Sequence, residues 1–158
     1  MKRLHIPNGW KKVEEVCICH IADENPDLTF LGEFANLPGQ FPIRHSDDPG
    51  QFRYFNAFNV CNEAEARQNY ERMMQFCNGD ICMMGIKVKA KIINSLSILI
   101  PGGTENRISS SGLWNIESDS DKKYIEEIER EKLSEMKDIL TTLGFTTKQI
   151  GDAPIKRD

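Results

Sequence analysis

The chain has 158 residues, which is enough for a single hydrophobic core, and we expect one domain over residues 1–158. Its 24 acidic and 20 basic side chains give a formal net charge of -4, too weak for a mimic of nucleic acid and of the wrong sign for a typical nucleic-acid binder. No apolar run approaches the roughly 20 residues of a membrane span and no secretory signal is evident, so we expect a cytosolic protein whose five cysteines are reduced thiols.

The first third of the chain predicts strands separated by a loop. Residues 13–21 mix β-branched residues with alternating polar ones, which is typical of a half-buried strand. Residues 28–34 also alternate, and we expect them to pair with the first strand in a hairpin. Three prolines and two glycines then interrupt residues 35–52, which predicts a long loop that ends in a short aromatic strand at 53–58.

A capping box predicts where the first helix begins. The side chain of Asn62 can accept a backbone N–H, and Glu65, three residues later, can reach back to the start of the helix. Apolar residues then recur at intervals of three and four up to Cys77. Asn78 and Gly79 supply a left-handed stop, so the helix is expected to end there.

Residues 81–93 form the clearest strand, because apolar residues alternate strictly with lysines in their second half. Further strands are predicted at 96–100 and around Trp114. The lysines could form a basic face for single-stranded nucleic acid, although a solvated face that discourages edge pairing is the simpler interpretation. The stripe consists of Lys87, Lys89 and Lys91.

An acidic turn, residues 117–121, begins an amphipathic helix that ends at Gly144. Carboxylates two residues apart suit a hard cation, but the turn lacks the length and the glycine of a calcium loop. We therefore expect Ser118 or Ser120 to cap the helix, and Trp114 to be buried between strand and helix.

The predicted elements add up to an α+β fold, with a mainly antiparallel sheet and two helices packed on one face. Residues 146–158 are polar and lack a clear periodicity, so we expect a loosely ordered tail.

The cysteines occur in two spacings, Cys17-x-Cys19-His20 and Cys77-x4-Cys82. Neither suits a tetrahedral zinc site, and strand alternation puts Cys17 and Cys19 on one face with His20 on the other. Buried thiols are the expected state, and a Cys–His nucleophile pair stays open as an alternative. The sequence predicts no catalytic residue, no metal and no cofactor.

Two groups of polar residues are candidates for a functional surface. The first is an acidic surface on the C-terminal helix and its preceding turn, which suits the basic groove of a partner, with a solvated helix face as the alternative. It comprises Glu117, Asp119, Asp121, Glu127, Glu131 and Glu135. The second lies in and beside the long loop, where it would line a ligand pocket or contact a partner. It comprises Arg44, His45, Asp47, Asp48 and Arg53.

Several segments, among them DLTFLGEF, QFRYF and above all SGLWNIESDSDKKYIEEIE, resemble a family of small accessory proteins carried by phages and other bacterial mobile elements. The resemblance covers most of residues 26–145. It departs at Asn115, where glycine is expected, and at Ile81 and Cys82, where a tryptophan is expected nearby. It implies a protein of the host bacterial cytosol that binds and inhibits a defence component, such as a CRISPR or restriction effector, through a protein–protein surface.

Two further functions stay open. One is a protein that binds or cleaves a nucleotide signal, and the other is a nucleic-acid-binding accessory factor. The acidic net charge argues against direct nucleic-acid contact. We expect a binding protein rather than an enzyme, expect no membrane partner, and leave a homo-oligomer open.

Overall fold

The computed structural model of the chain describes residues 11–94 and 106–158. Its contacts divide the chain into two compact units, whereas the sequence led us to expect one domain. Unit 1 comprises Met1–Ala22 and Met84–Asp158, and unit 2 comprises Asp23–Met83, so unit 2 is an insertion within unit 1. The strand predicted at 96–100 lies outside the described residues.

Unit 1 is built on a five-stranded sheet with the order β6-β5-β1-β8, in which β7 also pairs with β5. The strands are β1 (Lys11–Ala22), β5 (Met83–Asn94), β6 (Asn106–Ser109), β7 (Leu113–Glu117) and β8 (Ile155–Arg157). The long strands β1 and β5 are antiparallel; their register shifts between Val13 and Glu15, and they pair as far as Ala22, which lies opposite Met84. The alternating patterns at 13–21 and 81–93 therefore predicted real strands, but β1 pairs with β5 and not with residues 28–34.

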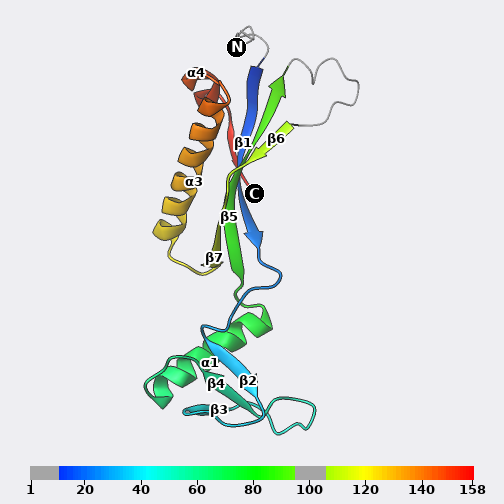
Figure 1. Cartoon of the computed structure of the whole chain (residues 1–158), viewed down its shortest axis with the longest axis vertical. Helices are drawn as coiled ribbons and strands as arrows, with labels where there is room; N and C mark the ends of the chain where they lie inside the picture. Colours follow the sequence, from blue (N-terminus) through cyan, green and yellow to red (C-terminus); the bar gives the residue numbers. More distant parts are fainter. Residues whose placement is uncertain (1–10, 95–105) are drawn as a thin grey trace, which may run out of the picture. The chain divides into compact units, whose positions relative to one another are not determined.

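Helices α3 (Lys122–Thr142) and α4 (Thr147–Gly151) cover one face of this sheet (Figure 1). The apolar residues of β1 and β5 that point to this face pack against the buried stripe of α3. Within unit 1, no helix of the described residues covers the opposite face, which carries the lysine stripe. The centre of the core consists of Ile18, Ile86, Val88, Ile116, Met136 and Leu140.

The C-terminal segment is ordered, in contrast to the loose tail expected at 146–158. Thr146 and Gln149 form a capping box that starts α4, and Ile150 and Ala153 are buried in the core of unit 1. The chain then adds β8 to the sheet, parallel to β1. Packing of two apolar residues and pairing along an existing strand outweigh the polar composition of the segment.

Unit 2 is a three-stranded antiparallel sheet with one helix. Its strands are β2 (Gly32–Ala35), β3 (Pro42–Arg44) and β4 (Tyr54–Ala57), in the order β2-β4-β3, and its helix is α1 (Glu63–Asn78). The core of unit 2 contains Leu31, Ile43, Phe55, Ala66 and Met73. The strand predicted at 28–34 is only β2, because residues before it form a turn in which the amide of Leu31 donates to the carbonyl of Leu28. The predicted loop at 35–52 contains the short strand β3.

The α+β class and the mainly antiparallel pairing are confirmed. The placement of both helices on one face is wrong, since α1 packs in the core of unit 2 and α3 in that of unit 1. Asn62 and Gly79 cap α1 as predicted, whereas α3 is capped by Asp121, whose carboxylate accepts from the amide of Lys123, and not by Ser118 or Ser120. None of the described helices is long and apolar enough to cross a membrane.

Candidate functional site

A hollow of about 530 Å³ lies beside β2 in unit 2, with two exposed aromatic side chains in its lining. Phe30 precedes β2 and is 47% exposed, and Phe58 follows β4 and is 63% exposed. Between them the floor contains Gly32 and backbone and side-chain atoms of β4. Apolar side chains of this size are rarely left in solvent around a concave surface unless the surface binds something.

Backbone hydrogen bonds bring the two aromatic residues together. The carbonyl of Leu31 accepts from the amide of Phe58 at 3.1 Å and from the side-chain amide of Asn69 at 2.9 Å. The turn before β2 and the residue after β4 are therefore joined at Leu31, and this brings Phe30 and Phe58 into the lining of one hollow.

Gly32 is required where the floor of the hollow approaches β4. Its φ of +147° is a conformation that side-chain-bearing residues rarely adopt, and a Cβ there would lie 2.4 Å from the carbonyl oxygen of Asn56. The side chain of Asn56 also holds the loop that follows β2. It accepts a hydrogen bond from the amide of Gly39 at 2.8 Å and donates one to the carbonyl of Leu37 at 3.0 Å.

Strand β2 lies at the edge of its sheet. Its residues Gly32–Ala35 pair with β4 on one side, and within the described residues no strand pairs with it on the other. An edge strand presents unpaired backbone groups that can accept another extended segment. Gly32 and Glu33 of this edge strand also contribute to the lining of the hollow.

The residues predicted to line a loop pocket have structural contacts instead. The ring of His45 packs against Phe34, with ring centroids 4.6 Å apart, and its Nδ1 lies 3.1 Å from the hydroxyl of Tyr70. The amide of His45 donates to the carbonyl of Arg53. Arg44 forms an ion pair with Asp47 and lies over the ring of Tyr54, while the Asp48 carboxylate accepts from the amide of Gly50. Neither hollow described for the two units is lined by these five candidates.

Glu135 of the predicted acidic surface has a structural role within unit 1. One carboxylate oxygen accepts from Lys132, which is buried, and the other accepts from the amide of Ser111, both at 2.9 Å. These hydrogen bonds, that of Lys132 first, lower the pKa of Glu135 to about 2. Glu135 therefore ties α3 to the connection between β6 and β7.

The exposed face of α3 carries no net charge. Glu129, which is buried, accepts from Arg157 of β8 and pairs with His20 of β1, so it does not contribute to an outer surface. Of the candidates, Glu127 and Glu131 are exposed, while Asp121 is occupied as the helix cap. This face carries equal numbers of acidic and basic residues, which argues against an acidic docking surface there. The exposed acidic residues are Glu126, Glu127, Glu131 and Asp138, and the basic ones are Lys122, Lys123, Arg130 and Lys137.

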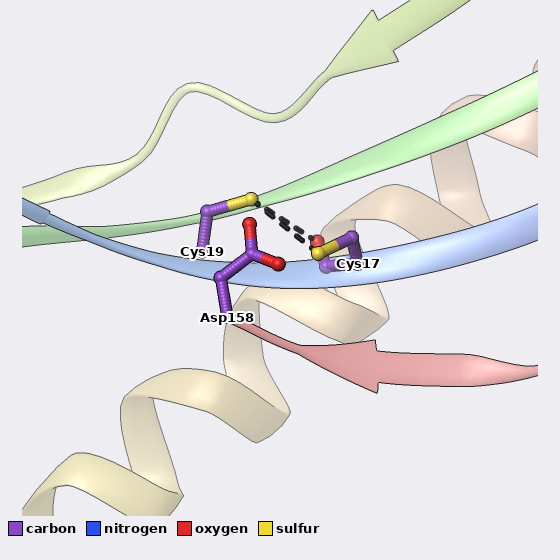
Figure 2. Close-up of side chains that lie close together, drawn as sticks. All are labelled: Cys17, Cys19 and Asp158. Carbon is purple, nitrogen blue, oxygen red and sulfur yellow. Dashed lines mark hydrogen bonds between the residues drawn. The ribbon is translucent and has the colours of Figure 1, made fainter.

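The uncovered face of the unit 1 sheet holds two thiols and a carboxylate side by side (Figure 2). Cys17 and Cys19 point to the same face of β1, as the alternation predicted, and their sulfur atoms are 3.7 Å apart. The amide of Asp158 donates to the carbonyl of Ile18, between the two cysteines, at 3.1 Å. The two sulfur atoms and a carboxylate oxygen of Asp158 all lie within 4.8 Å of one another.

Burial raises the pKa of the Cys17 thiol to about 12, and hydrogen bonds with Asp158 and Cys19 add to this effect. The same thiols lower the pKa of Asp158, with smaller contributions from Lys89 and Arg107. The cluster lines a pocket of about 220 Å³ together with these two basic residues and others. With its pKa raised in this way, the Cys17 thiol is protonated at neutral pH.

The sequence missed this cluster because its third member comes from the segment expected to be a loose tail. Only the parallel pairing of β8 with β1 brings Asp158 next to the cysteines. His20 lies on the other face, as predicted, where its Nε2 is 2.9 Å from Glu129.

Trp114 differs from the expectation that it would be buried under the helix. It is 43% exposed, and a Cβ on Gly85 of β5 would lie 2.4 Å from its ring, so the indole rests on the backbone of β5. Gly85 and Lys87 point to the same sheet face by alternation. Trp114 therefore belongs to the uncovered face of the sheet.

Comparison with known protein families, with curated proteins and with solved structures found no match to this chain.

Proposed function

We propose that the chain is a non-enzymatic binding protein that inhibits a component of a host defence system through a protein–protein surface on unit 2. The observation that carries the proposal is the aromatic-lined hollow beside the edge strand β2. The resemblance to accessory proteins of mobile elements supplies the kind of partner, a host defence protein.

The chemistry of the hollow favours a protein as its occupant. Aromatic side chains, phenylalanine among them, are enriched in the cores of protein interfaces, and Phe30 and Phe58 are already exposed in the unbound chain. The exposed face of α3, by contrast, offers a partner no net charge. We therefore propose the contact surface on unit 2 and not on the glutamates of α3.

The edge of β2 defines how the partner would bind. An extended segment can add to an edge strand through backbone hydrogen bonds, while every second side chain enters an adjacent pocket. We propose that the partner presents such a segment along Gly32–Ala35 and inserts an apolar side chain between Phe30 and Phe58.

The test combines two substitutions, Phe30→Glu and Phe58→Glu, which place charge in the lining of the hollow. Leu37→Glu is the matched control, because Leu37 is 77% exposed but does not line the hollow. The tagged chain captures its partner from a bacterial host lysate, and the purified partner is then used for affinity and activity measurements. We expect the double variant to weaken binding about tenfold or more and to relieve inhibition, while the control behaves as wild type.

Equal affinity of the double variant and the wild type would place the interface elsewhere. A purified partner that binds through the hollow but keeps its full activity would contradict the inhibitory role. An extended peptide copied from the partner should compete for the hollow, and failure of every such peptide would contradict binding along β2.

A second candidate function is contact with single-stranded nucleic acid through the uncovered face of the unit 1 sheet. The observation in its favour is that an exposed indole shares this face with a group of basic side chains, a combination that suits stacked bases and phosphates. Part of the positive charge is neutralised locally, since Lys91 pairs with Glu14 at 3.0 Å and Lys156 with Glu15 at 2.5 Å. The basic residues are Lys87, Lys89, Lys91, Arg107 and Lys156.

Salt-dependent binding of a labelled single-stranded oligonucleotide tests this candidate. We expect Trp114→Ala and Lys87→Glu to weaken any such binding, while Lys122→Glu on the opposite, helical side does not. Absence of binding at low salt, or equal loss in all three variants, would rule out this face as a nucleic-acid surface.

A further inference from the structure

We propose that Cys17, Cys19 and Asp158 form a three-ligand site for a thiophilic divalent cation with tetrahedral preference, of which Zn²⁺ is the typical example. The site is independent of the function proposed for unit 2. It lies on the uncovered face of the unit 1 sheet and joins β1 to β8 (Figure 2).

The separation of the two sulfur atoms matches the edge of a zinc tetrahedron. With Zn–S bonds of about 2.3 Å and a tetrahedral angle, two sulfur ligands are about 3.8 Å apart. The observed distance between the sulfur atoms of Cys17 and Cys19 is 3.7 Å. A spacing of two residues on a strand places both side chains on one face, so an ion can bridge them without a change of the backbone.

The third ligand is positioned by the backbone. The amide of Asp158 donates a hydrogen bond to the carbonyl of Ile18, the residue between the two cysteines. This bond holds Asp158 beside them. A carboxylate oxygen of Asp158 already lies within 4.8 Å of both sulfur atoms. Three protein ligands leave one tetrahedral position open toward the pocket, where a water molecule or an anion can bind.

The surrounding charges are compatible with a metal-bound state. Two thiolates and one carboxylate carry three negative charges, so a divalent cation would leave the centre with one net negative charge. Basic side chains of Lys89 and Arg107 line the same pocket and would stabilise that charge, whereas Lys156, also in the lining, is paired with Glu15. The cation would displace a proton from each thiol, as metal ions generally do at cysteine ligands.

The test uses the reduced chain with Cys61, Cys77 and Cys82 all changed to serine, so that only the two proposed sulfur ligands remain. Titration with Co²⁺ should give one equivalent of binding, with thiolate-to-cobalt charge-transfer bands and the visible bands of a tetrahedral ion. Zn²⁺ should displace the cobalt, and the binding should release about two protons, measured with an indicator dye in weak buffer.

Individual ligand variants then identify the donors. In the same background, Cys17→Ser and Cys19→Ser should each abolish the charge-transfer bands of a two-sulfur site, and Asp158→Asn should lower the Co²⁺ affinity about tenfold or more. The double change of His20→Gln and Glu127→Gln, away from this face, should leave the affinity unchanged. Far-ultraviolet circular dichroism without metal confirms that each variant is folded.

Thermal unfolding provides a readout that does not depend on cobalt. Saturating Zn²⁺ should raise the Tm of the background chain, because the ion binds only where β8 is paired with β1, and it should not raise the Tm of Cys17→Ser.

Three results would overturn the proposal. The first is the absence of thiolate-to-cobalt bands from the reduced chain. This result counts against the site even if mild oxidation of a separate sample joins the two cysteines in a disulfide, seen as a loss of two hydrogens in mass. The second is persistence of the bands in both cysteine variants. The third is an unchanged affinity in Asp158→Asn, which would exclude the three-ligand site as proposed.

Discussion

Glu135, which the sequence predicted on an acidic docking surface, makes contacts within the fold. Its carboxylate accepts hydrogen bonds from the buried Lys132 and from the amide of Ser111. Because these bonds favour the ionised form of Glu135 in the folded state, ionisation of Glu135 stabilises the fold.

We predict that Glu135→Gln lowers the free energy of unfolding by about 1 to 3 kcal/mol at pH 7, because the charge-assisted hydrogen bonds are weakened and Lys132 keeps a less favourable partner. The pKa of Glu135 is lowered from 4.5 to about 2, so its contribution is present above pH 4.5 and is lost as the pH falls toward 2. Urea denaturation of both proteins at pH 7 and pH 3 measures this.

Glu127→Gln is the control for the Glu135 prediction, since Glu127 is exposed on the same helix. It should change the stability little at either pH. A stability difference between wild type and Glu135→Gln that stays constant from pH 7 to pH 3 would contradict the assigned role.

Asn115 has a φ of 62°, which lies in the left-handed region. Asparagine is one of the few residues with a side chain that tolerates this conformation, and glycine tolerates it without strain. A backbone requirement for positive φ therefore explains why asparagine suits this position.

We predict that Asn115→Gly leaves the Tm nearly unchanged, whereas Asn115→Val lowers the stability by about 1 to 2 kcal/mol, because a β-branched residue is strained at positive φ. Differential scanning fluorimetry of the two variants measures the difference. Equal Tm values would mean that β7 adopts another backbone conformation at Asn115 in solution.

At the scale of elements, β8 depends on the short helix before it. Thr146 and Gln149 cap α4, and the amide of Val16 on β1 donates to the carbonyl of Pro154 just before β8. The position of β8, and with it that of Asp158, follows from this local cap.

We predict that Thr146→Ala costs about 1 kcal/mol and loosens α4 and β8 more than the rest of unit 1. The amide of Val16 donates to Pro154, and the amide of Ser110 donates to Val88. The substitution should accelerate hydrogen exchange of the Val16 amide more than that of the Ser110 amide. Equal acceleration of both amides would show that α4 and β8 do not open separately.

The elements differ in how far the sequence could predict them. Strands β1 and β5 were predictable because each carries a long alternation, and α1 because Asn62 and Gly79 mark its two ends. The pairing partners were not, because hydrogen bonding between β1 and β5 depends on residues far apart in the chain. The three residues Ile155–Arg157 are all exposed and carry no alternation, so only their parallel pairing reveals a strand.

The same distinction applies to the candidate sites. The common face of Cys17 and Cys19 followed from strand alternation, whereas Asp158 could be added only once β8 was placed beside β1. Local periodicity likewise gave no indication that Phe30 and Phe58 line one hollow. Their proximity depends on the hydrogen bond from the amide of Phe58 to the carbonyl of Leu31.

At the scale of the whole molecule, each unit has its own core. Phe55 is fully buried in unit 2, where its ring packs edge-on against Phe34. Units with separate cores can unfold at different free energies, so a single unfolding transition is not expected after selective destabilisation.

We predict that Phe55→Ala lowers the stability of unit 2 by about 3 to 5 kcal/mol and leaves unit 1 folded. Hydrogen exchange of the Phe58 amide, which donates to Leu31 in unit 2, should then lose protection, while the Ser110 amide, which donates to Val88 in unit 1, keeps it.

Ile86→Ala in the core of unit 1 is the reciprocal variant, since Ile86 is also fully buried. It should remove protection from Ser110. Loss of protection in both units in either variant would mean that they unfold as one cooperative body.

The insertion of unit 2 also has a consequence for the order of folding. β1 and β5 are neighbours in one sheet, yet the whole of Asp23–Met83 separates them in the chain. Closing so long an unfolded segment carries an entropic penalty that rises with its length, and non-local pairing of this kind is slow. In the folded chain the amide of Asp23 donates to the carbonyl of Met83 at 2.8 Å, so the two ends of the insertion lie together. We expect that folding of unit 2 shortens the effective separation of β1 and β5 and thereby speeds their pairing.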